Sequence, residues 1–218
     1  MIENETGAQA RAAIRVGRRG PTAAAAPGYV QANLVALSAE YADEFRSLCA
    51  RNPVACPLLD ELPPGVTATQ LAAGADLRVD VPAYRLYRDG ELKARSTDGR
   101  ELWRDDLSVF LIGCSFTFEW ALTRARLPPR HVQLGTNVPM YRTNVPLAPA
   151  GRLRGHLIVS MRPYLPADLD RVKAVTRPFS EAHGEPFWAG NPHELGIADL
   201  SAPDEGDAVP FEPGELPV

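Results

Sequence analysis

The segment Leu107–Gly113 (LSVFLIG) decides the fold, together with the pair Cys114–Ser115 and residues 116–126 (FTFEWALTRAR) that follow it. LSVFLIG is a continuous apolar run of strand length, which is typical of a buried strand. FTFEWALTRAR reads as a helix, and it stops before the prolines at 128–129, which cannot continue one. We therefore predict a buried strand, a turn at Cys114–Ser115 and a helix.

Strand and helix patterns alternate along the rest of the chain. A β-hairpin is predicted at 84–95 (YRLYRDGELKAR), because the Asp89–Gly90 dipeptide suits a type I′ turn. Residues 137–146 are interpreted as a loop bounded by prolines. Further strands are predicted at 29–37, 131–134 and 156–162, and further helices at 9–16, 38–49 and 168–177. This mixture predicts an α/β or α+β fold.

Composition excludes several classes of protein. The 218 residues carry a net charge of −4, which counts against a protein that neutralises nucleic-acid phosphates. The longest apolar run is less than half of the roughly 20 residues that a membrane-spanning helix needs. Cys49, Cys56 and Cys114 form no CxxC pair, and residues 1–21 contain no apolar stretch typical of a secretory signal. We expect a cytoplasmic protein with no nucleic-acid or membrane partner and with no metal ion or other cofactor.

A series of motifs gives the chain a family resemblance. In chain order they are 28–34 (GYVQANL), 56–60 (CPLLD), 74–78 (GADLR), 87–90 (YRDG), 103–107 (WRDDL), 110–116 (FLIGCSF), 137–144 (NVPMYRTN), 160–163 (SMRP), 195–200 (LGIADL) and 206–209 (GDAV). Together they resemble the bacterial hydro-lyase family whose relatives include the domain of mitochondrial D-glutamate cyclase. The resemblance covers nearly the whole chain from about Arg11 onward.

The resemblance implies both an architecture and an activity. It implies a three-layer α/β/α core with a smaller two-layer α+β lobe. We place an N-terminal helix or tail at 1–22, the core lobe at 23–114 plus 186–218, and the smaller lobe at 115–185. It also implies a hydro-lyase that closes D-glutamate to 5-oxo-D-proline with loss of water. Family members usually continue past Val218 with a further strand, so we expect either a truncated sequence or a member that lacks this segment, with impaired catalysis.

Lactam closure needs a carboxylate anchor, a base, an acid and donors for an oxyanion. Cys114 and Ser115 are the leading catalytic candidates, because a strand-to-helix turn would favour an anion there and would lower the pKa of the thiol. The alternative is that Ser115 is only a helix N-cap and that Cys114 is a small buried residue. The sequence leaves both open.

Asp106 and Glu119 are the acid and base candidates. Asp106 adjoins the apolar run, so we expect partial burial and a raised pKa. Glu119 lies near the start of the predicted helix, where a carboxylate could instead serve only the helix dipole. His131 and His183 are further candidate bases, and no spacing among the histidines indicates a metal site.

The candidates for substrate binding are residues that donate hydrogen bonds or carry positive charge. They are Arg78, Asn137, Tyr141, Arg142, Thr143, Asn144, Ser160 and Arg162. The five between 137 and 144 share one proline-bounded segment, and its alternative reading is a hydrogen-bonded turn. Arg78 and Arg162 could each bind a carboxylate or could pair with a neighbouring aspartate. Within this set we expect Arg142 to meet a substrate carboxylate.

Two other functions fit the same residues. In the first, Cys114 would be the covalent nucleophile of an amidase or lactamase that acts on an acidic amide. In the second, the protein would bind a small acidic ligand without catalysis. The expected partner in every case is a small acidic molecule, and the sequence leaves a homo-oligomer open.

Overall fold

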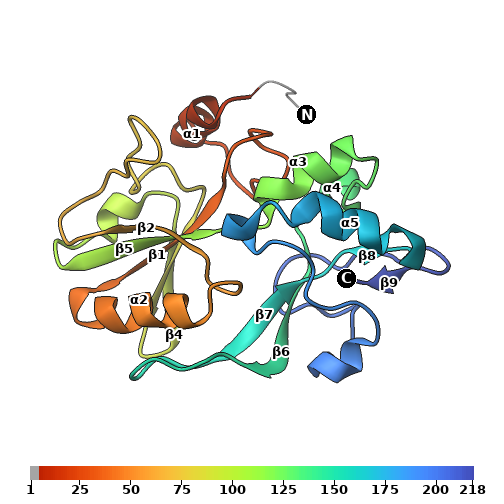
Figure 1. Cartoon of the computed structure of the whole chain (residues 1–218). Coiled ribbons are helices and arrows are strands. Elements are labelled where there is room, and N and C mark those ends of the chain that lie inside the picture. Colours follow the sequence, from red (N-terminus) through yellow and green to blue (C-terminus); the bar gives the residue numbers. More distant parts are fainter. Residues whose placement is uncertain (1–4) are drawn as a thin grey trace.

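The computed structural model describes residues 5–218, so residues 1–4 of the predicted N-terminal helix or tail lie outside it (Figure 1). Its α-helices are α1 (Gly7–Arg15), α2 (Ala42–Arg51), α3 (Phe116–Arg124), α4 (Arg130–Leu134) and α5 (Leu169–Thr176). Its strands are β1 (Ala32–Ser38), β2 (Leu58–Leu62), β3 (Tyr84–Arg88), β4 (Glu91–Ser96), β5 (Leu107–Gly113), β6 (Met140–Pro146), β7 (His156–Ser160), β8 (Pro163–Tyr164) and β9 (Leu216–Pro217). Short 3-10 turns include η4 (Ser180–Ala182) and η5 (Pro192–Leu195).

Strand β5 is the centre of a three-stranded sheet of order β1-β5-β2, in which both pairings are antiparallel. Successive side chains of a strand point to opposite faces of its sheet. Val109 and Leu111 therefore enter one apolar cluster, and Phe110 and Ile112 enter another. Both faces of β5 are buried, which is why its sequence is a continuous apolar run. The prediction of a buried strand followed by a helix is confirmed.

The two faces of this sheet are covered differently. Helix α2 packs on one face, where the ring centroids of Phe45 and Phe110 lie 4.8 Å apart. On the other face, Leu62 and Leu77 pack beneath Trp103, and within residues 5–218 no helix covers that cluster. The fold is mixed α/β, as predicted, but the expected three-layer α/β/α core is wrong. Segments without regular secondary structure cover that face in place of the expected third layer.

Two local predictions are corrected. Residues 131–134 belong to helix α4 rather than to a strand, because Pro129 precedes the helix and Gly135 ends it with φ 69°. Residues 140–146 form strand β6 rather than a loop, because they pair with β7. The predicted hairpin is confirmed as β3–β4. Its turn residues Asp89 and Gly90 both have positive φ, as a type I′ turn requires.

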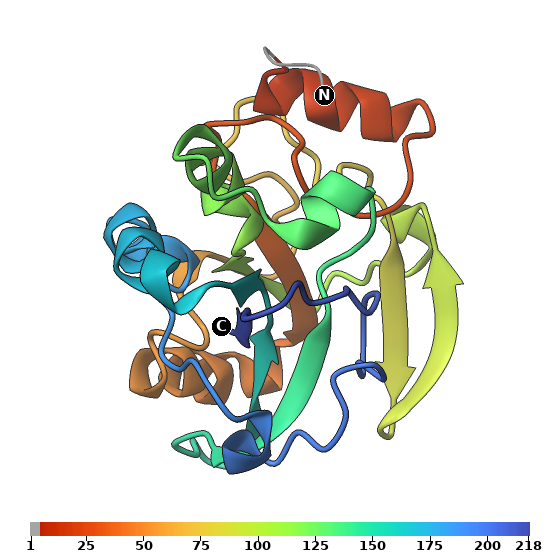
Figure 2. The same ribbon diagram turned by 90° about the vertical axis from the view of Figure 1, so that its right-hand side faces the viewer.

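The second half of the chain builds a separate layer of helices beside the β6–β7 ribbon (Figure 2). Helix α3 packs against α5 through Leu122 and Val172. The end of the chain returns to this layer, where β9 pairs with β8. The backbone amide of Arg162 donates to the carbonyl of Val218 over 2.8 Å, and the reverse bond is 3.0 Å. The final residue therefore lies beside Arg162.

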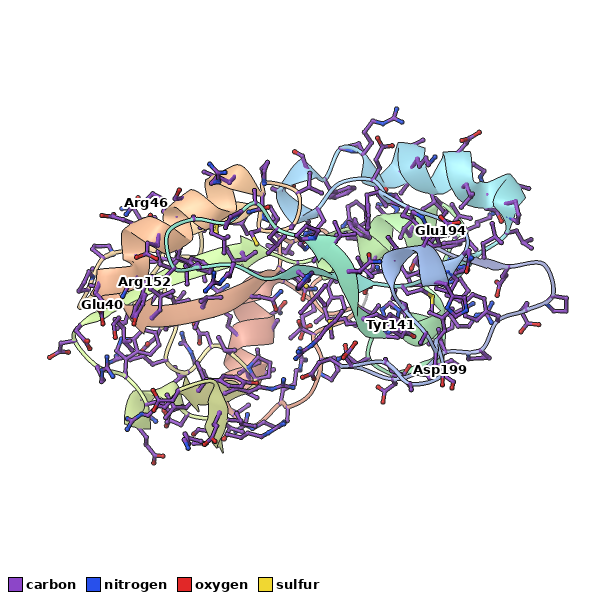
Figure 3. The ribbon with its side chains drawn as sticks, turned by 90° about the horizontal axis from the view of Figure 1, so that it is seen from below. Glu40, Arg46, Tyr141, Arg152, Glu194 and Asp199 are labelled. Atoms are coloured by element: carbon purple, nitrogen blue, oxygen red, sulfur yellow. The ribbon has the colours of Figure 1, made fainter. Side chains whose placement is uncertain are left out.

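Polar contacts join the β6–β7 connection to α2. The side-chain nitrogen of Asn52 donates to the carbonyl of Ala148 over 2.9 Å. The backbone amide of Ala148 donates to the side-chain oxygen of Asn52 over 2.8 Å. Arg152 pairs with Glu44 over 2.8 Å, and Figure 3 shows Arg152 and Glu40 on this side of the molecule. Among the described residues, no helix is long and apolar enough to cross a membrane. The proposed lobe boundaries stay a prediction.

Candidate active site

A cavity of about 500 Å³ lies between α3, the β6–β7 ribbon and the segment 183–200. Three of the residues predicted for the site line it, namely Ser115, Ser160 and Arg162. His183 also lines it, and most of the remaining wall is apolar. The strand-to-helix turn after β5 brings Ser115 to this wall, and the short link between β7 and β8 brings Arg162.

Arg162 is the centre of the polar end of the cavity. Its side chain is buried, and Nη2 donates to Glu119 Oε1 over 2.6 Å and to Ser115 Oγ over 3.0 Å. The guanidinium also lies 5.3 Å from the ring centroid of Phe118. Arg162 Nε has no hydrogen-bond partner among the described residues. Buried donors without a partner are uncommon in folded proteins, which marks Arg162 as a candidate ligand-binding group.

Glu119 lies directly behind Arg162 and contacts a second basic group. His131 Nε2 is 2.8 Å from Glu119 Oε1, without the alignment of a full hydrogen bond, and each side chain is only 1% exposed. Burial by itself would raise the pKa of Glu119. The adjacent His131 and the charge of Arg162 outweigh burial, so the pKa is lowered and the carboxyl is ionised. Glu119 therefore serves as the counter-charge of a buried arginine.

Ser115 has a contact that its sequence position does not reveal. Its side chain makes no N-cap hydrogen bond to α3, so the interpretation as a helix cap is wrong. Its oxygen instead accepts a hydrogen bond from Arg162. This arrangement leaves the hydroxyl proton of Ser115 free to be donated at the cavity wall.

Cys114 does not share this environment. The residue is absent from the described lining of the cavity, although its neighbour Ser115 is part of it. Burial raises the pKa of the Cys114 thiol, and this effect outweighs the backbone hydrogen bond at Phe116. The expectation of a lowered thiol pKa is wrong, because desolvation exceeds the effect of the helix terminus.

Asp106 is far from the cavity. It precedes β5, whereas Ser115 follows the other end of that seven-residue strand, so the strand separates them by roughly 20 Å. Asp106 is exposed and pairs with Arg104 over 2.7 Å. The hydrogen bond from Arg104 lowers the pKa of Asp106. The expectation of a partly buried Asp106 with a raised pKa is therefore wrong.

The side chains from 137 to 144 bind mainly to the protein itself. Tyr141 donates to the carbonyl of Leu200 over 2.7 Å, and Figure 3 shows it beside the segment that carries Asp199. Burial raises the pKa of Tyr141 to about 12. Thr143 donates to the carbonyl of Leu157. None of the five residues proposed from this segment lines the cavity. The first residue of β6 that lines it is Val145.

The other candidates have local partners as well. Asn137 accepts from the amide of Val138, and Asn144 donates to the carbonyl of Glu194. Arg142 is exposed and lies 3.7 Å from Asp204, and Arg78 pairs with Asp76 over 2.9 Å. The arginine that reaches the cavity is therefore Arg162 rather than Arg142 or Arg78.

His183 lines the cavity directly after η4. Its Nδ1 lies 2.8 Å from the carbonyl oxygen of Val54, which can only accept, so Nδ1 carries a proton. Burial lowers the pKa of His183 more than the carbonyls of Val54 and Gly113 raise it. The imidazole is therefore neutral at pH 7.

This lowered pKa predicts acid sensitivity. The unfolded chain binds a proton at His183 at a higher pH than the folded chain does, so stability is fully present above the ordinary histidine pKa. It falls as the pH drops below about 6.5, with a slope of at most about 1.4 kcal/mol per pH unit from this group. We expect His183→Asn to flatten that slope in urea-unfolding measurements between pH 5 and 8. Asparagine tolerates the left-handed φ of 79° at this position. An unchanged slope would contradict the prediction.

Comparison with known proteins assigns the family. The family model described as D-glutamate cyclase matches residues 108–218, the part of the chain that carries Ser115, Glu119 and Arg162. The chain belongs to the D-glutamate cyclase family. A "Putative hydro-lyase" of Arthrobacter sp. (strain FB24) is 52% identical, over 96% of this chain and 78% of the relative.

Further relatives of this D-glutamate cyclase family member have the same description. "Putative hydro-lyase Bpet2233" of Bordetella petrii is 52% identical over 99% of this chain and 83% of the relative. "Putative hydro-lyase SCO1412" of Streptomyces coelicolor is 53% identical over 96% and 76%. The chain is thus a member of a hydro-lyase family, and the predicted resemblance is confirmed.

Proposed function

We propose that this D-glutamate cyclase family member closes an acidic amino acid such as D-glutamate to its lactam, 5-oxo-D-proline, and releases water. The observation that carries the proposal is Arg162, a buried cation at the polar end of a largely apolar cavity. A guanidinium binds a carboxylate through charge-assisted hydrogen bonds. Arg162 lines the cavity and its Nε has no partner among the described residues, so we expect the guanidinium to receive the α-carboxylate.

The apolar wall favours the reactive form of the substrate. In water at neutral pH the amine of glutamate is protonated and its γ-carboxyl is ionised, so neither group reacts. Burial in apolar surroundings lowers the pKa of an amine and raises that of a carboxyl. The cavity would therefore stabilise a free amine next to a neutral carboxyl group. Attack of the amine on that carboxyl carbon forms the lactam bond.

The groups at the polar end supply the proton transfers and the charge stabilisation. The hydroxyl of Ser115 is free to donate to the oxyanion of the tetrahedral intermediate. The neutral imidazole of His183 at the same cavity is suited to accept a proton from the attacking amine. The two protons that the ammonium loses leave on the oxygen of the departing water, so the reaction needs no net acid or base. Glu119 holds Arg162 and is a positioning residue.

The test is incubation of the protein with D-glutamate, with 5-oxoproline followed by NMR. We expect turnover by the native chain and a loss of about a hundredfold in kcat/KM in Arg162→Lys, since lysine cannot reproduce the planar donors. Arg142→Lys is the matched control and should retain full activity, because Arg142 is exposed and outside the cavity. The absence of product at high enzyme loading, with saturable D-glutamate binding, would instead favour a non-catalytic binder.

Substitution of Cys114 separates this reaction from a cysteine-dependent amidase. We expect Cys114→Ala to cyclise D-glutamate within about twofold of the native rate, because the thiol lies outside the described lining and its pKa is raised. Progress curves on D-glutamate measure the cyclisation rate of the variant. Thiol labelling followed by mass spectrometry measures the reactivity of Cys114 in the native chain. Complete loss of activity with an unchanged melting temperature would restore Cys114 as the nucleophile.

A further inference from the structure

The cavity has more room than D-glutamate needs. Each non-hydrogen atom of glutamate displaces at most about one water of roughly 30 Å³, so the whole molecule fills no more than about 300 Å³. The cavity measures about 500 Å³, which lies within the range of roughly 300 to 1,000 Å³ typical of sites for larger organic ligands. A substantial volume therefore remains beyond the groups that react.

Most of the remaining wall is hydrocarbon. Leu157 and Val159 of the β6–β7 ribbon face the cavity, and Trp188 and Ile197 face it from the segment after η4. Within residues 5–218, Arg162 is the only arginine or lysine in the lining. Among the side chains that line the cavity in residues 5–218, the carboxylate of Glu185 pairs with Arg177. The wall thus offers one guanidinium, which is already paired with Glu119, a few polar groups such as His183, and mostly apolar surface elsewhere.

Several large side chains of this wall are left in contact with water. Val54 is 58% exposed and Phe187 is 55% exposed, and both line the cavity. Exposed apolar surface that is concave and continuous with a buried charged group is typical of a ligand site. The polar end and the apolar wall belong to one cavity, so one molecule can occupy both.

From this we infer that the cavity contains an apolar subsite that binds an alkyl or aryl group of the ligand. The preferred ligand class is a carboxylate with a hydrocarbon body, held by Arg162 at one end and by the wall around Phe187 at the other. The inference deepens the proposed function, on which it rests for the role of the cavity as the substrate site. The inference predicts that an acidic amino acid with an apolar substituent is a better substrate than unsubstituted glutamate.

The test measures the binding of unbranched carboxylates from butanoate to octanoate by calorimetry. Each added CH₂ that enters the wall should tighten binding by about threefold to fourfold, so octanoate should bind about a hundredfold more tightly than butanoate. Octanamide, which has no charge, should bind at least about tenfold more weakly than octanoate. A flat series, or equal binding of octanamide and octanoate, would overturn the inference.

A matched pair of variants locates the subsite. Phe187→Ser should weaken octanoate binding by about tenfold and leave butanoate unchanged, because only the longer chain reaches that part of the wall. Tyr87→Ser is the control, since Tyr87 is 54% exposed on the β3–β4 hairpin and outside the cavity. Equal effects of both substitutions would also overturn the inference.

The two proposals can fail separately. A chain-length dependence without turnover of D-glutamate would refute the cyclase reaction and leave the apolar subsite supported. Turnover of D-glutamate without a chain-length dependence would refute the subsite and leave the reaction supported.

Discussion

Glu119→Leu is expected to lower the free energy of unfolding by about 3 to 5 kcal/mol, because it leaves a buried arginine without its counter-charge. Arg162 and His131 both contact Glu119 Oε1, and both are buried with it. Urea unfolding monitored by circular dichroism measures the loss. The same variant should have no cyclase activity, since Arg162 is no longer held.

Two further variants test the cause of this loss. Asp106→Asn removes a carboxylate from an exposed ion pair with Arg104 and should cost no more than about 1 kcal/mol. The double variant Glu119→Leu with Arg162→Met should recover part of the loss, because neither charge is then left unpaired. A cost below about 1 kcal/mol for Glu119→Leu alone would show that Glu119 is not the essential partner of Arg162.

Gly113→Ala is the second substitution with a large expected effect. A Cβ atom at Gly113 would overlap the carbonyl group of Glu181, which is backbone and cannot rotate away. We expect a loss of about 3 kcal/mol or more in unfolding free energy, since either the end of β5 or the η4 segment must shift. His183 follows that segment, so ligand binding in the cavity should weaken as well.

Gly155→Ala is the matched control for Gly113→Ala. No atom lies within 4 Å of a Cβ at Gly155, and its φ is not in the left-handed region. Its unfolding free energy should stay within about 1 kcal/mol of the native value, with any change on the stabilising side. Similar costs for both glycines would mean that close packing against Glu181 is not the cause.

Sequence reasoning predicted the parts of the fold that depend on local patterns. The apolar run of β5, the helix after Ser115 and the Asp89–Gly90 hairpin follow from periodicity and turn chemistry. The third layer that the family resemblance implied is wrong, because the covering of a sheet face depends on segments that are distant in the sequence. Residues 63–83 carry no helical pattern, yet Leu77 from this segment packs on the sheet.

The candidate site was likewise predicted only in part from the sequence. Ser115, Glu119, Ser160 and Arg162 were all named from the sequence, but the contacts of Arg162 with Ser115 and Glu119 depend on tertiary structure. Asp106 and Cys114 were assigned shifted pKa values of the wrong sign, because burial and ion pairing cannot be read from neighbours in sequence.

One signal could have revealed Glu119 as a buried group. It lies three residues before the buried Leu122, so the two side chains share one inward face of α3. An acidic residue on such a face needs a buried cation as its partner. The sequence pattern does not say that Arg162 and His131 are the basic groups beside it.

The central position of β5 in its sheet affects whether the region matched by the family model can fold when it is produced as a separate fragment. A fragment that begins at residue 108 would keep Ser115, Glu119 and Arg162. It would lose β1 and β2, which pair with both edges of β5, and most of the cover of both faces. An apolar strand with two open edges is a template for aggregation. The boundary of the recognised family region is therefore not a boundary of independent folding, and the residues of the site depend on strands that contribute no side chain to it.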